Sequence, residues 1–168
     1  MPKIHPNLAV STFSRRSLGA SALAASIVSG CAPIQRSTAP LVLFICQYGT
    51  AKSAIARELF RARAKQRQLA VAAFSRGLVI EDHVTPQLRQ RLAADGIDPF
   101  ADKPQVLQPA DWQRATVIVA FNPLPPQVPA AKVRDWTDLP SINDDYDRTR
   151  AELDRRLEAL LDELAVLA

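Results

Sequence analysis

The chain has 168 residues, of which 48% are hydrophobic and 23% are charged, with a formal net charge of +4 and only two cysteines. Three basic residues and no acidic ones lie within the first 30 positions, so the net charge of the remaining 138 residues is +1. This charge gives no indication of nucleic-acid binding, and no basic patch with interleaved aromatic residues is present. The length beyond residue 30 suits one domain with its own core.

The N-terminal segment resembles an export signal. Paired arginines in Ser14–Leu18 are typical of a twin-arginine signal, and the apolar segment 18–29 is too short for an ordinary membrane span. Residues 28–31 (Val-Ser-Gly-Cys) resemble a bacterial lipoprotein box, which makes Cys31 the predicted lipidated residue. A weakly hydrophobic N-terminal tail is the alternative interpretation.

These signals predict three parts: an export signal peptide over 1–30, a tether over 31–40 and a folded domain over 41–168. The mature protein would be exported and held on the periplasmic or cell-surface side of a membrane through the lipid on Cys31. No second long apolar run occurs, so no transmembrane helix is expected after cleavage. The oligomeric state is open.

The domain opens with the stretch around which the rest is organised. The apolar run 41–45 predicts a buried strand of a parallel sheet, and Cys46 stands at its end. A short loop, 47–51, leads into Lys52-Ser53 and a segment with helical spacing. Strand, tight loop and helix place a cysteine beside backbone N–H groups and a helix N-terminus, which bind anions and favour a thiolate.

Cysteine usage supports a chemical role for Cys46. If Cys31 is lipidated, Cys46 is the single free thiol and no internal disulfide can form. The alternative is a small buried hydrophobic residue that ends a strand. His83, in the polar loop 81–84, is predicted to be exposed, and no second ligand lies at metal-binding spacing, so neither a metal nor a cofactor is predicted.

Further elements follow in order. A helix is predicted over 53–68 and a strand over 69–74, closed by Ser75-Arg76-Gly77. Thr85-Pro86 predicts a capped helix that ends at Asp95-Gly96. The basic residues of the first helix are expected to form a solvated face: Arg57, Arg61, Arg63, Lys65 and Arg67.

The C-terminal half continues the alternation of helices and strands. A short helix begins at Pro109, the apolar run 116–121 predicts a third strand, and a proline-rich loop begins at Asn122. A short strand over 132–136 precedes a long helix over 147–167, whose leucines recur at helical spacing and are expected to be core. This order predicts an α/β domain with a parallel sheet, whose ligands bind at the carboxyl ends of the strands.

Residues 41–60 resemble the phosphate-binding loop of low-molecular-weight protein tyrosine phosphatases and the related thioredoxin-coupled arsenate reductases. Their pattern is an apolar strand, Cys, five residues, Arg, Ser and a helix. This chain has Cys46, five residues, Lys52 and Ser53, so lysine replaces the arginine of the family. Lysine keeps the charge and loses the bidentate grip of a guanidinium. Gly96-Ile97-Asp98 also matches the family, and Ser75-Arg76-Gly77 stands where it usually has Ser-Ala-Gly.

The resemblance implies a three-layer, flavodoxin-like domain with four parallel strands in the order 2-1-3-4 and helices on both faces. It also implies a phosphatase that hydrolyses phosphotyrosine or a related phosphate ester, in a phosphoprotein or a small molecule, through a cysteinyl-phosphate intermediate. Cys46 would be the nucleophile, Lys52 would hold the phosphoryl oxygens and Ser53 would bond the sulfur. The phosphate-binding loop would comprise Gln47, Tyr48, Gly49, Thr50 and Ala51.

The family's general acid is the Asp of an Asp-Pro pair before the last helix, and Asp138 is the candidate here. Leu139 separates it from Pro140, and the competing aspartates are Asp135, Asp144 and Asp145. The family's aromatic residue after Asp-Pro has no clear match, so Tyr48 is a candidate for lining the site.

Two alternatives remain open. The altered Lys52 and Asp138 positions favour an inactive module that binds anions or phosphoproteins on the same scaffold. An arsenate reductase is disfavoured because that chemistry passes electrons through further cysteines, which the mature chain lacks.

Overall fold

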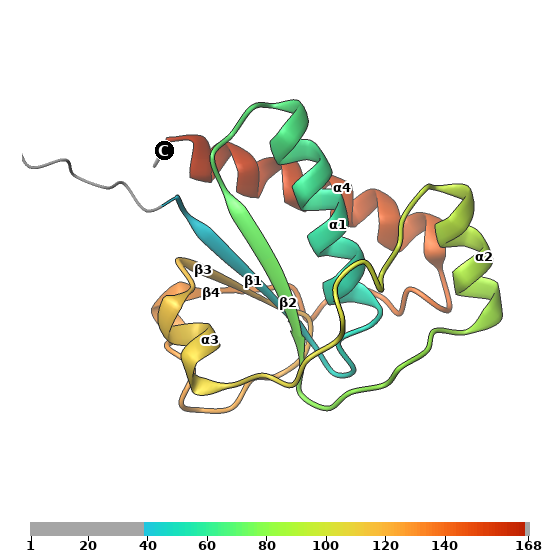
Figure 1. The fold of residues 1–168 in the computed structure, drawn as a ribbon, viewed down its shortest axis with the longest axis horizontal. Coiled ribbons are helices and arrows are strands. Elements are labelled where there is room, and N and C mark those ends of the chain that lie inside the picture. The colour runs from blue at the N-terminus through green and yellow to red at the C-terminus, as the bar shows by residue number, and fades with distance from the viewer. Residues whose placement is uncertain (1–38, 167–168) are drawn as a thin grey trace, which may run out of the picture. The chain divides into compact units, whose positions relative to one another are not determined.

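A computed structural model describes residues 39–166, which form an α/β domain around one parallel sheet (Figure 1). The predicted signal peptide and Cys31 lie outside the described residues, as does nearly all of the tether. No helix within 39–166 is both long and apolar enough to cross a bilayer. The elements are β1 (Leu41–Cys46), α1 (Lys52–Gln66), β2 (Ala72–Gly77), α2 (Pro86–Ala94), α3 (Pro109–Arg114), β3 (Val117–Ala120), the 3-10 turn η1 (Ala130–Lys132), β4 (Val133–Asp135) and α4 (Tyr146–Ala165).

The sheet confirms the predicted fold class. Its four strands are all parallel and run in the order β2-β1-β3-β4. Helices α1, α2 and α4 cover one face and α3 covers the other (Figure 1). The central strand β1 is therefore buried on both faces, which explains its unbroken apolar sequence.

Alternate side chains of β1 supply two separate cores. Val42 and Phe44 point toward α1 and α4, whereas Leu43 and Ile45 point toward α3. The leucine stripe of α4 is fully part of the first core, as predicted: Leu153, Leu157, Leu160, Leu161 and Leu164.

The second strand lies three residues later than predicted, because Leu69 has another role. Gln68 has a positive φ of 56°, and the amides of Gln68 and Leu69 bond to the carbonyls of Lys65 and Ala64. This is a Schellman ending of α1, and Leu69 packs on the core as its apolar contact. The strand then pairs Leu41 with Ala72, and Ser75-Arg76-Gly77 belongs to it.

Helix α2 has the predicted N-terminus. The Thr85 hydroxyl accepts a bond from the amide of Leu88 at 3.3 Å, and Pro86 occupies the first helical position. Gly96, just after the helix, has a positive φ of 68°, a conformation that glycine adopts without steric cost.

Candidate functional site

Cys46 is the last residue of β1 and lies between the ends of β2 and β3. It is buried, with 4% of its surface exposed. The loop 47–51 turns the chain directly into α1, so the sulfur lies close to the N-terminal turn of that helix. This is the carboxyl edge of the sheet, where the sequence predicted a site.

Two groups of the predicted loop contact the sulfur. The Ser53 hydroxyl lies 3.0 Å from Cys46 Sγ, and the amide of Gly49 donates to Sγ at 3.2 Å. When the sulfur is ionised it can only accept, so the hydroxyl must donate. Both bonds then stabilise the thiolate, which is the nucleophilic form of cysteine.

The N-terminus of α1 adds a positive potential beside this sulfur. Its N-cap residue, Ala51, has no side chain that could cap the helix, and the first turn contains no acidic residue. The first N–H groups of a helix have no intrahelical partner and favour an anion. The local sequence thus leaves this helix end suited to a phosphate group.

Backbone contacts fix the conformation of the loop. Gly49 has a φ of 74° and packs against Gly77 at the end of β2. A Cβ atom on Gly77 would lie 2.2 Å from the carbonyl oxygen of Val79, which no structure tolerates. The amides of Leu78 and Val79 bond to the carbonyls of Cys46 and Gln47 at 3.1 and 2.9 Å. Because Gly77 has no side chain, the segment after β2 can approach the loop closely enough to form these backbone bonds.

Lys52 lies at the start of α1, half-buried, with Nζ 3.2 Å from the carbonyl oxygen of Leu139 and 5.9 Å from the centroid of the Phe121 ring. Burial lowers the pKa of Lys52, and the negative charges of Cys46 and Asp138 oppose that shift. The ammonium group thus lies near that carbonyl and the Phe121 ring. The residue interposed in the predicted Asp-Pro pair, Leu139, supplies its hydrogen-bond acceptor.

Asp138 forms a bidentate ion pair with Arg156, at 2.8 and 2.6 Å. Hydrogen bonds from Arg156 lower the pKa of Asp138, so its carboxyl group is ionised at neutral pH. Of the competitors, Asp145 caps α4 through the amide of Arg148, and Asp135 accepts from the amide of Thr137. Asp144 is exposed. The assignment of the general acid therefore stays a prediction.

Other loop residues contact positions that sequence reasoning missed. The Gln47 amide donates to Asn122 Oδ1 at 2.9 Å, so this N–H group already has a side-chain acceptor. Thr50 is buried and its hydroxyl lies 3.5 Å from the carbonyl of His83, whose side chain is exposed as predicted. Tyr48 is 44% exposed. Asn122 could have been found, because it lies two residues after β3, whose carboxyl end lies beside that of β1.

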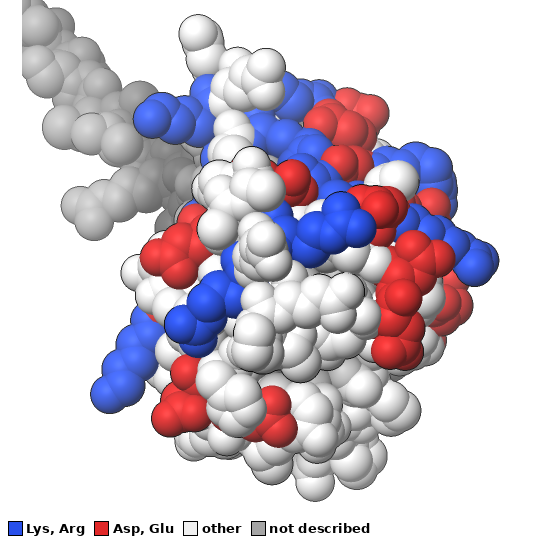
Figure 2. All heavy atoms as spheres, turned by 90° about the vertical axis from the view of Figure 1, so that its right-hand side faces the viewer, with Lys and Arg blue, Asp and Glu red and all other residues white. Residues whose placement is uncertain are grey.

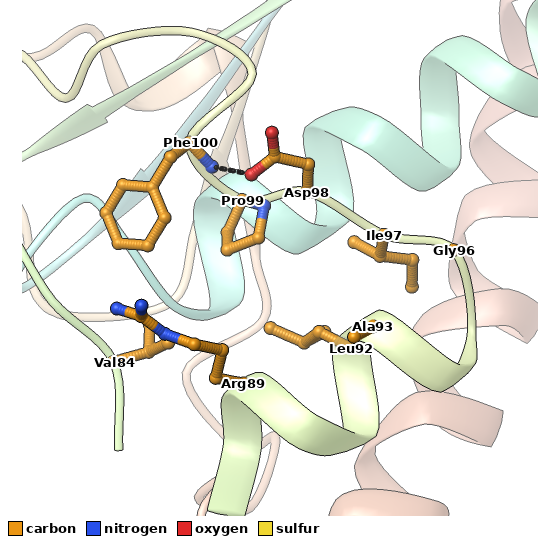
Figure 3. A pocket seen from close by; sticks show the side chains of 9 residues that line it. All are labelled: Val84, Arg89, Leu92, Ala93, Gly96, Ile97, Asp98, Pro99 and Phe100. Carbon is orange, nitrogen blue, oxygen red and sulfur yellow. Dashed lines mark hydrogen bonds between the residues drawn. The ribbon is translucent and has the colours of Figure 1, made fainter. Parts of the chain in front are cut away.

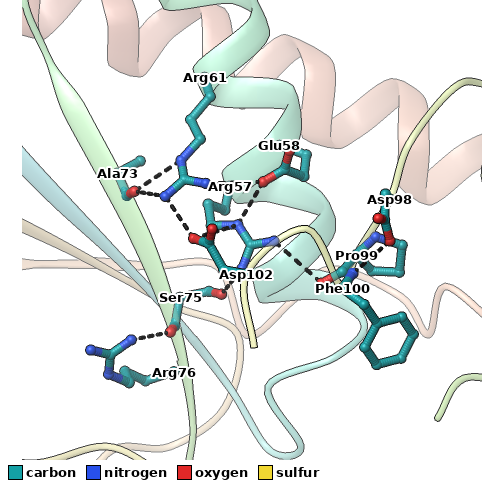
Figure 4. A network of polar contacts seen from close by, with 10 residues as sticks. All are labelled: Arg57, Glu58, Arg61, Ala73, Ser75, Arg76, Asp98, Pro99, Phe100 and Asp102. Atoms are coloured by element: carbon teal, nitrogen blue, oxygen red, sulfur yellow. Dashed lines mark hydrogen bonds and ion pairs between the residues drawn. The ribbon is translucent and has the colours of Figure 1, made fainter. Parts of the chain in front are cut away.

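The expectation of a solvated basic face on α1 is wrong for Arg57, which is 1% exposed (Figure 4). Its guanidinium donates to Glu58 at 2.7 Å, to Ser75 Oγ at 2.8 Å and to the Pro99 carbonyl at 3.2 Å. Asp102 bonds Arg61 at 2.7 Å in the same network. A guanidinium can be buried when its donors are satisfied in this way, and sequence spacing alone does not reveal such partners.

A hollow of about 390 Å³ lies between α2 and the segment 96–100, away from the cysteine (Figure 3). Its walls are mostly apolar, with the guanidinium of Arg89 at its margin. It contains no nucleophile. No group of three or more potential metal ligands occurs within residues 39–166.

Comparison with solved structures shows the same fold. YfkJ from Bacillus subtilis is 17% identical over 77% of this chain and 97% of its own, with a TM-score of 0.66. A low molecular weight protein tyrosine phosphatase from T. tengcongensis is 21% identical over 74% of this chain and 99% of its own, with a TM-score of 0.64. A thioredoxin-dependent arsenate reductase from Corynebacterium glutamicum is 20% identical over 79% of this chain and 65% of its own, with a TM-score of 0.60.

A search of curated proteins found no significant match. The family described as low molecular weight phosphotyrosine protein phosphatase matches residues 41–124. The matched half of the chain begins with β1 and extends two residues beyond Asn122, and so contains Cys46 and the whole loop. The chain therefore belongs to the low molecular weight phosphotyrosine protein phosphatase family.

Proposed function

We propose that the protein hydrolyses phosphate monoesters through a covalent intermediate on Cys46. The observation that carries the proposal is the sulfur at the end of β1, contacted by Ser53 and the Gly49 amide beside an uncapped helix N-terminus. The family match supports a phosphatase as the class of enzyme.

In the first step the thiolate of Cys46 attacks phosphorus, the bond from phosphorus to the leaving oxygen breaks, and the leaving oxygen takes a proton from a general acid and departs as the alcohol. In the second step water attacks phosphorus, the bond from sulfur to phosphorus breaks, and inorganic phosphate is released. The loop amides and the charge of Lys52 would stabilise the transferring group, and the Ser53 hydroxyl would stabilise the departing sulfur.

The decisive experiment is p-nitrophenyl phosphate hydrolysis by the purified protein. Replacing the nucleophile in Cys46→Ser should abolish turnover while phosphate and vanadate still bind. A Ser75→Ala variant is the matched control, because Ser75 is buried and does not contact the sulfur. Turnover that survives in Cys46→Ser would refute the mechanism.

Asp138 is proposed as the general acid, once it is released from Arg156 and protonated. An acid matters most for poor leaving groups. Asp138→Asn should therefore slow the hydrolysis of phenyl phosphate much more than that of p-nitrophenyl phosphate. Equal effects on both substrates would instead give Asp138 a structural role with Arg156.

A catalytically inactive anion-binding module is the second candidate. Two observations favour it: Lys52 Nζ is bonded to the Leu139 carbonyl, and Asp138 is ion-paired. Phosphate binding without any Cys46-dependent turnover would select this candidate. An arsenate reductase is less well supported, because Cys46 is the one cysteine among the residues that the structure describes.

We also propose, from the sequence motif alone, that the protein is exported and lipid-anchored through Cys31. Labelled palmitate should be incorporated into the wild-type protein and the Cys46→Ser variant, and lost from Cys31→Ser. Recovery of unlabelled wild-type protein from the cytoplasm would refute the anchor.

A further inference from the structure

An apolar rim borders the loop that holds Cys46. Five large apolar side chains are more than one-third exposed within residues 39–166, and four of them form this rim: Tyr48, Val79, Ile80 and Val106 at 44%, 47%, 38% and 44%. Single exposed apolar residues are common, but a group of them beside a site marks a binding surface.

The rim is assembled from three chain segments that are joined by backbone bonds. The amides of Val79 and Glu81 bond to the carbonyls of Gln47 and Tyr48, at 2.9 and 3.3 Å. The third segment joins β2 through a parallel bridge between Gly77 and Val106. Backbone pairing fixes these segments, so the rim has a defined shape.

The rim also lies directly against the site. A Cβ atom on Gly49 would be 3.3 Å from Ile80 Cδ1, and Gly49 is the residue whose amide bonds the sulfur. Ile80 therefore packs beside the residue of the loop that contacts the sulfur. Three of the four rim side chains are aliphatic, and Tyr48, the fourth, has no aromatic side chain stacked on it within the described residues, so the rim is mainly aliphatic.

The distribution of charged side chains near the rim also favours an uncharged leaving group. Figure 2 shows charged side chains crowded over the upper part of the molecule, and fewer in the lower part, where they lie mostly on the left. The strands end at that lower edge in Figure 1. The charged residues that directly follow the rim segment are Glu81 and Asp82, both acidic. A substrate with negative charges beyond its phosphate would be repelled there.

We propose that the rim binds the aliphatic part of the substrate, and that the substrate class is the phosphate monoester of a long-chain alcohol. This inference rests on the proposed phosphatase function and specifies its substrate. The phosphate would occupy the loop, and the chain would lie across Ile80, Val79 and Val106. Release of the alcohol and then of phosphate follows the two steps given above, with water as the only co-reactant.

The test is the dependence of kcat/KM on chain length for butyl, hexyl and octyl phosphate, measured as phosphate release. The rim contacts only one side of an alkyl chain, so each CH₂ is partly buried. We therefore expect kcat/KM to rise about twofold per CH₂, and roughly 15-fold from butyl to octyl phosphate. The affinity of Cys46→Ser for the same three esters, measured by calorimetry, should show the same trend.

Isosteric variants test whether the rim residues cause the dependence on chain length. Val79→Thr combined with Val106→Thr keeps side-chain shape and backbone bonds, and should reduce the octyl-to-butyl ratio to about fourfold, with half the gain per CH₂ lost. Val166→Thr is the matched control, because Val166 is exposed at the far end of α4 and should leave the ratio unchanged.

The outcomes distinguish a failure of the aliphatic substrate class from a failure of the phosphatase function. Turnover of p-nitrophenyl phosphate with no dependence on chain length overturns the aliphatic substrate class and leaves the phosphatase function intact. A preference of tenfold or more for a phosphotyrosine peptide over octyl phosphate does the same. Absence of Cys46-dependent turnover overturns the phosphatase function, and the calorimetric trend with Cys46→Ser then decides whether the rim binds aliphatic chains.

Discussion

The loop around Cys46 and the network around Arg57 both belong to the start of α1, yet they are held together differently. Backbone bonds and close glycine packing hold the loop, and few side chains take part. Side-chain hydrogen bonds and ion pairs hold the network, which joins α1 to β2 and to the segment 98–102 (Figure 4). We therefore expect changes in the network or in the packed glycines to cost stability, whereas removal of a side chain that contacts the sulfur should cost activity.

The largest expected effect tests the network. Arg57→Met should lower the free energy of unfolding by about 3 kcal/mol, because the Ser75 hydroxyl and the Pro99 carbonyl lose a charged donor in a buried position. Urea unfolding followed by circular dichroism measures this loss. Arg67→Met is the control, since Arg67 is exposed and its pairs with Glu158 and Asp162 lie at the surface. Equal midpoints for the two variants would contradict the comparison.

The packing of the loop gives the next effect. Gly49→Ala should lower the free energy of unfolding by about 2 kcal/mol, because the alanine would adopt a positive φ and its Cβ would lie 3.0 Å from the Gly77 amide. Gly96→Ala has a similar φ with nothing within 4 Å, so it reports the conformational strain alone. Thermal or urea unfolding of both variants gives the contribution of the close contact. If Gly49→Ala and Gly96→Ala lowered the free energy of unfolding by the same amount, the close contact at Gly49 would contribute nothing.

Two buried serines offer a matched pair for activity. Ser53→Ala removes the hydroxyl that contacts the sulfur and should lower kcat for p-nitrophenyl phosphate about tenfold, or about 1.4 kcal/mol of barrier. Ser75→Ala removes a partner of Arg57 and should lower stability without changing kcat. The comparison fails if the two serines affect kcat equally.

The smallest effect concerns Lys52 and pH. Because burial lowers its pKa, Lys52 loses its proton at a lower pH than an ordinary lysine, whose pKa is 10.5. Phosphate affinity, measured as competitive inhibition, should therefore decline with rising pH before pH 10.5 is reached. Lys52→Arg should remove this decline, since a guanidinium stays protonated, and should raise phosphate affinity a few-fold through bidentate contact. A fall in affinity would show that the side chain does not face the anion.

Local sequence patterns were enough for much of the fold. The uninterrupted apolar run of β1, the Thr85-Pro86 start of α2 and the leucine period of α4 each depend on neighbours in the chain. Cys46, Gly49 and Ser53 are also close in sequence, so the predicted loop brought together residues that do contact one another.

Tertiary structure decided the features that depend on distant segments. Nothing local distinguishes the buried Arg57 from the exposed Arg67, because the partners of Arg57 on β2 and in the segment 98–102 are 18 and 42 residues away. Three further contacts likewise join separate segments: the bond from Gln47 to Asn122, the ion pair of Asp138 with Arg156, and the bridge between Gly77 and Val106. The sequence by itself determined a cysteine in a strand-loop-helix, since hydrophobic period and turn chemistry are local. Which charges are buried and which apolar groups border the loop followed only from packing, because those contacts form between elements that the chain order does not place side by side.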